Sequence, residues 1–174
     1  FSSRSAVYGD AGKKLFKEND QRRPINPYGD SKLMCEKILE WAARSGTIGY
    51  VTFRYFNAAG ADPDGELGED HRPEKHLIPN ILRFAAGKQR KLFVYGRNYP
   101  TKDGTCMRDY YHVTDIAAAH ARAIEYLSDG GKSLALNIGT GKGQTVLETI
   151  RQAERVTGRT LRPVFAPPRV GDPA

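Results

Sequence analysis

The sequence predicts an α/β fold, because stretches with helical spacing alternate with short apolar stretches typical of strands. From Tyr28 onward, apolar residues recur every three or four positions, which is the spacing of an amphipathic helix. Residues 50–56 are β-branched and aromatic, which is typical of a buried strand. With 39% apolar and 27% charged residues, the chain of 174 residues has the composition of a globular protein with a sizeable core.

The first 72 residues are expected to hold two strands, one helix and two loops. Pro24 and Pro27 punctuate the approach to the helix, and Gly46 marks its end. The second loop is rich in Gly, Asp and Pro, and its length is typical of a functional or lid segment. In chain order the elements are a strand and turn over 1–8, a polar loop over 11–23, a helix from 28 to about 46, a strand over 50–56 and a loop over 57–72.

The remaining residues are expected to alternate between helices and short strands. The helix that starts at Val113 has an Ala-rich centre, and Ala is the strongest helix former. In chain order the elements are a helix over 76–86, a strand over 91–95, a loop over 97–108, a helix over 113–127, a strand over 134–138, a helix over 146–156 and a strand over 163–165.

Charge and cysteine content narrow the class of protein. The net charge is +7, but the basic residues are dispersed and no nucleic-acid-reading motif accompanies them, so no nucleic-acid partner is expected. No apolar run reaches the length of a membrane span, so no membrane partner is expected either. Only Cys35 and Cys106 are present, which argues against a disulfide scaffold and suits a reducing cytoplasm.

Tyr28 and Lys32 are the most informative pair of residues in the chain. Residues four positions apart share one face of a helix. A phenol has an ordinary pKa near 10, and a neighbouring ammonium lowers that pKa toward the working range of a base. The pair therefore has the minimum composition for taking a proton from an alcohol. Chance produces such a pair in roughly half of chains of this composition, so the neighbouring residues must decide.

Several local blocks, in one fixed order, resemble the UDP-glucose 4-epimerases, which are extended short-chain dehydrogenase/reductases. The resemblance spans nearly the whole chain. The blocks are Phe1-Ser2-Ser3 with Val7-Tyr8-Gly9, 26–32, Arg54-Tyr55-Phe56-Asn57, His76-Leu77-Ile78-Pro79, 103–113 with Asp115, 137–141 and 168–172. The resemblance implies the later part of a Rossmann-type doubly wound parallel sheet plus a smaller mixed α/β substrate domain.

The resemblance also implies that the chain is organised in two domains. Residues 1–60 would form the C-terminal part of an NAD-binding domain and contain the Tyr-Lys pair. Residues 61–174 would form mainly a UDP-sugar-binding domain, with some strands returning to the Rossmann sheet. We expect the chain to be a partial one, because the Gly-rich fingerprint that seats NAD is absent, and we expect weak NAD binding by this chain alone. A homodimer is expected of the full-length protein.

The implied reaction interconverts UDP-glucose and UDP-galactose through a 4-keto sugar, with NAD as cofactor. Tyr28 would take the proton of the sugar 4-hydroxyl, and Lys32 would lower its pKa and hold the nicotinamide ribose. Ser3 and Phe56 would also contact the cofactor, although Phe56 is equally well read as a core aromatic.

The resemblance implies eight contacts to the UDP-sugar, and no metal site is assigned. Arg108 and Arg169 would grip the diphosphate, since guanidinium groups match phosphate oxygens. Tyr95 would stack on the uracil, with a plain strand residue as the alternative reading. His76 stays open between a pocket residue and a structural histidine. The eight residues are Asn57, His76, Leu77, Phe93, Tyr95, Arg108, Arg169 and Asp172.

One departure from the family pattern lies at the centre of the implied site. The family has Ser or Thr where this chain has Arg4, and that hydroxyl bridges the sugar and the tyrosine; Ser5 is a possible substitute. Alternatives therefore stay open. They are another UDP-sugar epimerase, a sister dehydratase or decarboxylase, and a non-catalytic nucleotide-sugar-binding remnant. A dehydratase needs an acid pair that Ser3-Arg4-Ser5 does not supply. The sugar preference, glucose or N-acetylglucosamine, is not readable from the chain.

Overall fold

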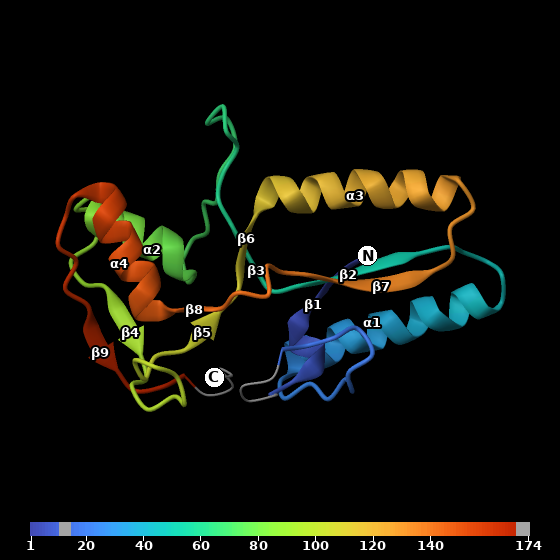
Figure 1. Ribbon diagram of the computed structural model, residues 1–174, viewed down its shortest axis with the longest axis horizontal. Coiled ribbons are helices and arrows are strands. Elements are labelled where there is room, and N and C mark those ends of the chain that lie inside the picture. The colour runs from blue at the N-terminus through green and yellow to red at the C-terminus, as the bar shows by residue number, and fades with distance from the viewer. Residues whose placement is uncertain (11–14, 170–174) are drawn as a thin grey trace. The chain divides into compact units, whose positions relative to one another are not determined.

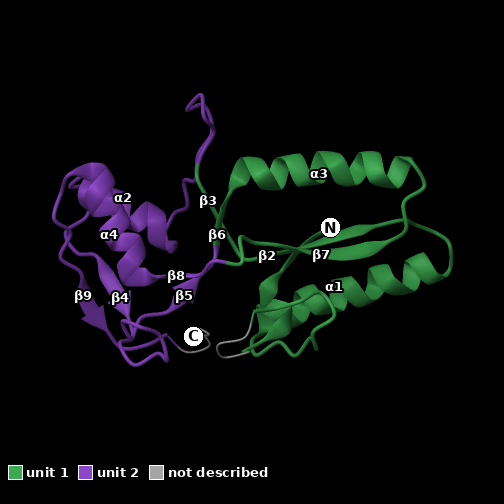
Figure 2. Ribbon diagram, viewed as in Figure 1, with its two compact units in different colours: residues 1–60, 110–141 green, residues 61–109, 142–174 purple. Residues whose placement is uncertain are grey.

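The computed structural model describes residues 1–10 and 15–169 and has the α/β architecture that the sequence predicts (Figure 1). The chain divides into two compact units, each built from two separate segments (Figure 2). Unit 1 comprises residues 1–60 and 110–141, and unit 2 comprises residues 61–109 and 142–174. Within the described residues, the helices are all too short or too polar to cross a lipid bilayer.

Unit 1 is built on a parallel sheet of three strands in the order β1-β2-β7. These strands are β1 (Ser2–Arg4), β2 (Val51–Tyr55) and β7 (Leu134–Ile138). Helices α1 (Pro27–Arg44) and α3 (Val113–Ser128) lie on opposite faces of this sheet (Figure 1). The central strand β2 is buried over four of its five residues because helices cover both faces, as in doubly wound folds.

The start of α1 is specified by its first residues. The Asn26 side chain caps the helix by accepting a hydrogen bond from the Gly29 amide at 2.8 Å, and Pro27 occupies the first turn. A 3-10 helix, η1 (Ser5–Tyr8), packs against this start, and a small core of Val7, Tyr8 and Leu33 joins the two. The helix therefore begins where the sequence predicts and holds Tyr28 in its first turn.

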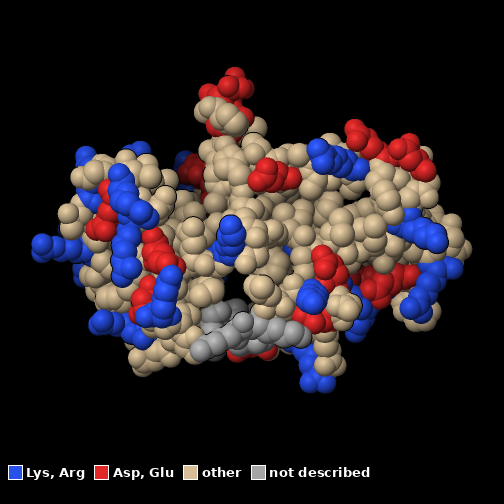
Figure 3. Space-filling model, in the orientation of Figure 1, with Lys and Arg blue, Asp and Glu red and all other residues tan. Residues whose placement is uncertain are grey.

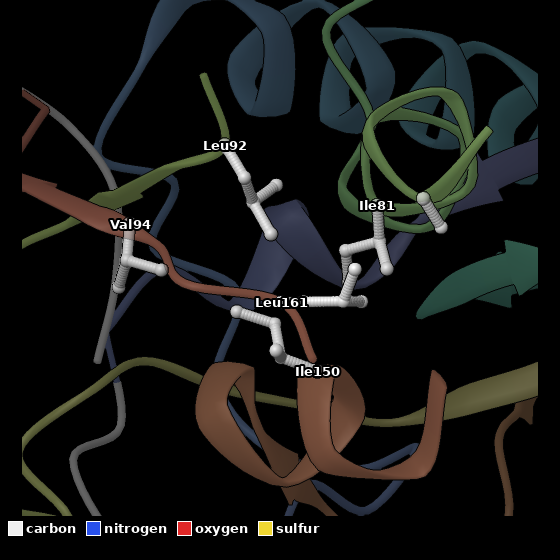
Figure 4. Close-up of a cluster of buried hydrophobic side chains, with 6 residues drawn as sticks. Ile81, Leu92, Val94, Ile150 and Leu161 are labelled. Atoms are coloured by element: carbon white, nitrogen blue, oxygen red, sulfur yellow. The ribbon is translucent and has the colours of Figure 1, made fainter. Parts of the chain in front are cut away.

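Unit 2 packs two helices and two short sheets around one apolar cluster. Strand β4 (Phe93–Tyr95) pairs in parallel with β9 (Val164–Ala166), and β5 (Met107–Arg108) pairs antiparallel with β8 (Gln144–Thr145). The helices are α2 (Leu77–Ala85) and α4 (Val146–Thr157), and a capping box of Thr145 and Glu148 starts α4. The buried cluster drawn in Figure 4 includes Ile81, Leu92, Val94, Ile150 and Leu161.

Four short strands lie where the sequence predicts loop or assigns no element, so the loop expectation was wrong over 57–59 and 107–108. They are β5 and β8 in unit 2, and β3 (Asn57–Ala59) with its parallel partner β6 (Tyr110–His112) in unit 1. Each has only two or three residues and pairs with a segment remote in the sequence. Such strands have no local periodicity, because their hydrogen bonds come from tertiary pairing. The predicted helices and longer strands are confirmed within one or two residues.

Candidate active site

Tyr28 and Lys32 lie together at the N-terminal end of α1. The Lys32 ammonium is 5.8 Å from the centre of the Tyr28 ring and donates a hydrogen bond to the main-chain oxygen of Ser2 at 3.0 Å. Tyr28 is 52% exposed, so its ring is accessible to a ligand. The helical spacing thus brings together a phenol and an ammonium. The Ser2 carbonyl, at the start of β1, holds the ammonium in place.

A chain of three side chains continues from Ser2 across the sheet to α3. The Ser2 hydroxyl lies 3.1 Å from the Tyr55 hydroxyl, which lies 2.9 Å from Nε2 of His120. His120 Nδ1 is 2.9 Å from the Ile116 carbonyl oxygen, which can only accept. Nδ1 therefore donates to this oxygen, and Nε2 is hydrogen-bonded to the Tyr55 hydroxyl. This chain orders the hydroxyl groups on the side of β1 that Ser2 occupies.

Arg4 and Ser5 lie at the junction of β1 and η1. Arg4 is extended, with φ −147° and ψ 153°, and Ser5 opens the 3-10 helix. The start of α1 packs closely against the 3-10 helix η1. A Cβ added at Gly29 of α1 would lie only 2.5 Å from the carbonyl oxygen of Ala6 in η1, so the two backbones leave no space for a side chain there. The structure therefore brings the Arg4-Ser5 segment and the first turn of α1 into one region of unit 1.

The opposite face of β1 carries a buried network centred on Glu36. The fully buried Ser3 hydroxyl donates to Glu36 at 2.5 Å, and Arg54 donates to the same carboxylate through Nη2 at 2.7 Å. Arg22 adds a third donor at 3.0 Å. Burial by itself raises the pKa of Glu36, but the hydrogen bonds from Arg54, Ser3 and Arg22 together with the Arg54 charge hold it below its ordinary value. The Ser3 hydroxyl therefore faces Glu36, and its role as a cofactor contact stays a prediction.

Phe56 and Asn57 follow the carboxyl end of β2. Ligands of doubly wound sheets bind outside the carboxyl ends of the strands, so both residues occupy a suitable place. The Phe56 ring lies 6.2 Å from the Phe16 ring, and its amide donates to Ile138 at 3.2 Å. Asn57 opens β3 opposite Tyr110 of β6.

In unit 2, the structure brings Tyr95 and Arg169 into contact. The Arg169 guanidinium lies 3.9 Å from the centre of the Tyr95 ring, and a second such pair joins Arg97 and Phe165 at 4.2 Å. Both pairs arise because β4 lies beside β9, which places their ends next to each other. An aromatic face beside a guanidinium suits a planar base attached to a phosphate.

The other predicted substrate residues are spread over unit 2. His76 is the N-cap residue of α2 and Leu77 is its first residue. Phe93 is 6.2 Å from Tyr95 between ring centres, and Arg108 belongs to β5, where it donates to the Met107 carbonyl at 2.7 Å. Asp172 lies outside the described residues.

The sequence patterns did not predict the hydrogen-bonded residues that surround the Tyr28–Lys32 pair. Arg54 lies inside a strand predicted to be buried, and a buried guanidinium requires a buried acid. Glu36 follows Leu33 by three positions on the same helix face, which was the available signal for the partner. Tyr55 and His120 had no such signal, because their contact depends on the packing of α3 on the sheet.

Comparisons with known proteins agree with this geometry. The model of the NAD dependent epimerase/dehydratase family matches residues 1–139. The chain is 50% identical to the UDP-glucose 4-epimerase of Lacticaseibacillus casei, over all of this chain and 53% of that protein. It spans about half the length of the curated relatives it matches.

Solved structures give the same result. The UDP-glucose 4-epimerase from Brucella ovis in complex with NAD superposes with a TM-score of 0.92 at 48% identity, covering 99% of this chain and 53% of that one. The enzyme from Stenotrophomonas maltophila with bound NAD and formylated UDP-arabinopyranose gives a TM-score of 0.95 at 40% identity, covering 100% and 52%. This chain therefore belongs to the NAD dependent epimerase/dehydratase family.

Proposed function

We propose that this chain supplies the Tyr-Lys pair and most of the nucleotide-sugar contacts of a UDP-glucose 4-epimerase. The observation that carries the proposal is the placement of Lys32, whose ammonium lies beside the Tyr28 ring and is anchored to the Ser2 carbonyl. The 50% identity to a UDP-glucose 4-epimerase supports the choice of activity. The substrate is UDP-glucose or UDP-galactose.

Tyr28 and Lys32 perform the proton transfer of this reaction. The Lys32 charge stabilises the phenolate, so Tyr28 takes the proton of the sugar 4-hydroxyl and later returns it. Bound NAD would supply the acceptor, and then the donor, of the hydride that leaves the sugar carbon and returns to its other face. Among the described residues, the Lys32 ammonium donates to the Ser2 carbonyl, so it keeps protons for the nicotinamide end of that cofactor beside the exposed Tyr28 ring.

The nucleotide contacts lie in unit 2. Tyr95 and Arg169 bind the uracil and diphosphate, and Arg108 adds a second positive charge. We assign residues 1–60 to the NAD-binding domain and residues 61–174 mainly to the UDP-sugar-binding domain. The pairing of β7 with β2 supports the return of a later strand to the first sheet.

A chimaera tests the activity. This chain replaces the aligned residues of the Lacticaseibacillus casei relative, and interconversion of UDP-glucose and UDP-galactose is measured. Tyr28→Phe should lower kcat by about 10²–10⁴, the usual contribution of a general base. Tyr126→Phe is the matched control, because that hydroxyl, on α3, donates to the main-chain carbonyl of Lys132 at 3.0 Å. Unchanged turnover in Tyr28→Phe rejects the proposal.

The second candidate is a non-catalytic protein that binds a nucleotide sugar, and Arg4 is the observation that favours it. It predicts UDP binding by the chimaera with no turnover of either hexose. Turnover of UDP-N-acetylglucosamine or a UDP-pentose in preference to UDP-glucose identifies another UDP-sugar epimerase instead.

We also propose that the full-length protein is a cytoplasmic homodimer. Helix α1 exposes Met34, Ile38 and Trp41, which are each more than half exposed and spaced along one face. The sequence contains only two cysteines, which supports a reducing compartment. In the full-length protein, light scattering of the Ile38→Glu variant should show a monomer. The matched control is Ile124→Glu on α3, which should stay a dimer, because Ile124 is equally exposed but lies on another helix. A dimer in both variants contradicts this interface.

A further inference from the structure

Four side chains that can ligate a metal converge in the segment between β3 and α2. They are Glu69, His71, Glu74 and His76, and one ligand atom from each lies within 4.8 Å of the others. His71 Nδ1 is 3.1 Å from Glu69 Oε1 and 3.9 Å from Glu74 Oε2. His76 Nδ1 is 3.3 Å from Glu74 Oε1 and contacts Glu69 Oε1. Both imidazoles thus direct Nδ1 toward the same two carboxylates.

The cluster is held in place by the local backbone. The amides of Lys75 and His76 donate to Glu74 Oε1, each at 2.8 Å, and the Glu74 side chain is almost fully buried. The two imidazole rings meet edge to face with centres 4.9 Å apart. Glu74 therefore has a fixed carboxylate around which the more exposed Glu69, His71 and His76 gather.

Three of the separations, 3.1, 3.3 and 3.9 Å, are close to those of ligands around one small cation, whereas His76 Nδ1 and Glu69 Oε1 lie closer together. Nitrogen and carboxylate oxygen bind Zn²⁺ at about 2.0–2.2 Å, so neighbouring ligands of a tetrahedral ion lie about 3.3–3.6 Å apart. Two imidazoles with two carboxylates form a donor set that suits zinc and related transition metals better than Mg²⁺ or Ca²⁺. Two carboxylate charges also neutralise one divalent ion.

We propose that Glu69, His71, Glu74 and His76 form a binding site for one divalent transition-metal cation, with Zn²⁺ as the best match. Each imidazole binds the ion through the lone pair of Nδ1 and carries its proton on Nε2. The ion takes the place of the direct contacts between the two imidazoles and the two carboxylates. It then ties the segment after β3 to the first residue before α2 within unit 2. His76 is also among the residues that the resemblance assigns to the UDP-sugar, so the tests change only His71 and Glu69 and measure metal binding, not turnover.

Isothermal titration of the metal-stripped chain with ZnCl₂ tests the proposal. We expect one equivalent to bind with a dissociation constant of about 10 µM or tighter. His71→Ala and Glu69→Gln should each weaken binding by more than about 100-fold, because even residues that only orient a ligand contribute about 10–100-fold. Asp70→Asn is the matched control for Glu69→Gln, since Asp70 lies in the same segment but binds Arg72 at 3.0 Å.

A second measurement identifies the geometry. Co²⁺ in place of Zn²⁺ should give the intense visible absorption of a tetrahedral site, and His71→Ala should remove it. Circular dichroism of each variant checks that the fold is retained. The proposal is overturned if the wild-type chain shows no saturable Zn²⁺ binding. It is equally overturned if the folded His71→Ala and Glu69→Gln variants bind Zn²⁺ as tightly as Asp70→Asn does.

Discussion

Glu36 of α1 and Arg54 of β2 form a buried ion pair in which Nη2 lies 2.7 Å from Oε2, and their side chains are only 2% and 4% exposed. Arg54 Nε donates to the same carboxylate at 3.1 Å, and Ser3 of β1 donates at 2.5 Å. The pair therefore joins the helix that carries Tyr28 and Lys32 to two strands of the sheet. It thereby anchors α1, at Glu36, to strands β1 and β2.

Removing the Glu36 charge should strongly destabilise unit 1. Glu36→Gln leaves the Arg54 guanidinium buried without its counter-charge, which typically costs about 3–5 kcal/mol. Urea unfolding followed by far-UV circular dichroism measures the loss. Glu40→Gln is the matched control: its partner Arg22 lies at 2.6 Å, but both side chains are partly exposed, so the expected loss is below about 1 kcal/mol. Equal losses in the two variants contradict the prediction.

The same pair predicts how stability depends on pH. The folded pKa of Glu36 lies below its ordinary value of 4.5, since the hydrogen bonds from Arg54 and Ser3 outweigh the effect of burial. The ionised form thus stabilises the fold above that ordinary value, and this contribution is lost as the pH falls through the lower folded pKa.

The stability difference between wild type and Glu36→Gln isolates this contribution from that of other carboxyls. We expect the difference to stay constant above about pH 5 and to shrink steadily as the pH falls below the ordinary value. Urea unfolding of both proteins across this range measures it. A difference that grows on acidification has the wrong sign and rejects the assignment.

The elements and residues that could be predicted from the sequence are specified by residues close to them in the chain. Helix α1 has its cap at Asn26, a proline in its first turn and apolar residues at helical spacing, so its start and the Tyr28–Lys32 pair follow from neighbouring residues. The strand over 50–56 has a continuous β-branched and aromatic run, and β2 lies inside it.

The features that sequence analysis missed depend on contacts between remote segments. Strand β3 pairs with β6, more than fifty positions away, and neither has the length to show a pattern. A buried Arg54 predicts that an acidic side chain is buried beside it. Which acid this is depends on the packing of α1 on the sheet, which brings Glu36 to Arg54. Glu69 and His71 of the proposed metal site lie in the predicted loop over 57–72, where no periodicity indicates that they converge with Glu74 and His76.

Gly29 should tolerate no side chain, because α1 and η1 approach each other there. An alanine Cβ would lie 2.5 Å from the Ala6 carbonyl oxygen and 3.0 Å from Pro24 Cβ, so the helix start must move away. We expect Gly29→Ala to destabilise the chain by about 1–3 kcal/mol in urea unfolding, although alanine favours helices. Gly49→Ala is the control, since its nearest contact is an ordinary 3.4 Å. A stabilising Gly29→Ala substitution refutes this close approach.

Arg4 is predicted to limit turnover at the candidate site. Arg4 is the last residue of β1 and, in the alignment that the family resemblance implies, occupies the position of the Ser or Thr whose hydroxyl bridges the sugar and the tyrosine. A long charged side chain at this position crowds a sugar next to Tyr28 and supplies no hydroxyl. In the chimaera with the Lacticaseibacillus casei relative, Arg4→Ser should therefore raise kcat by about tenfold or more while changing KM little.

The matched control for Arg4→Ser is Arg90→Ser, which makes the same chemical change at an exposed position of unit 2. A rise in kcat confined to Arg4→Ser means that the base, its lysine and the nucleotide contacts form a working site that lacks only a hydroxyl. Unchanged kcat means that Arg4 already points away from the sugar or that Ser5 replaces the hydroxyl, and a double variant with Ser5→Ala separates these cases. If Arg4→Ser and its parent both bind UDP without turnover, the chain belongs with the non-catalytic binders.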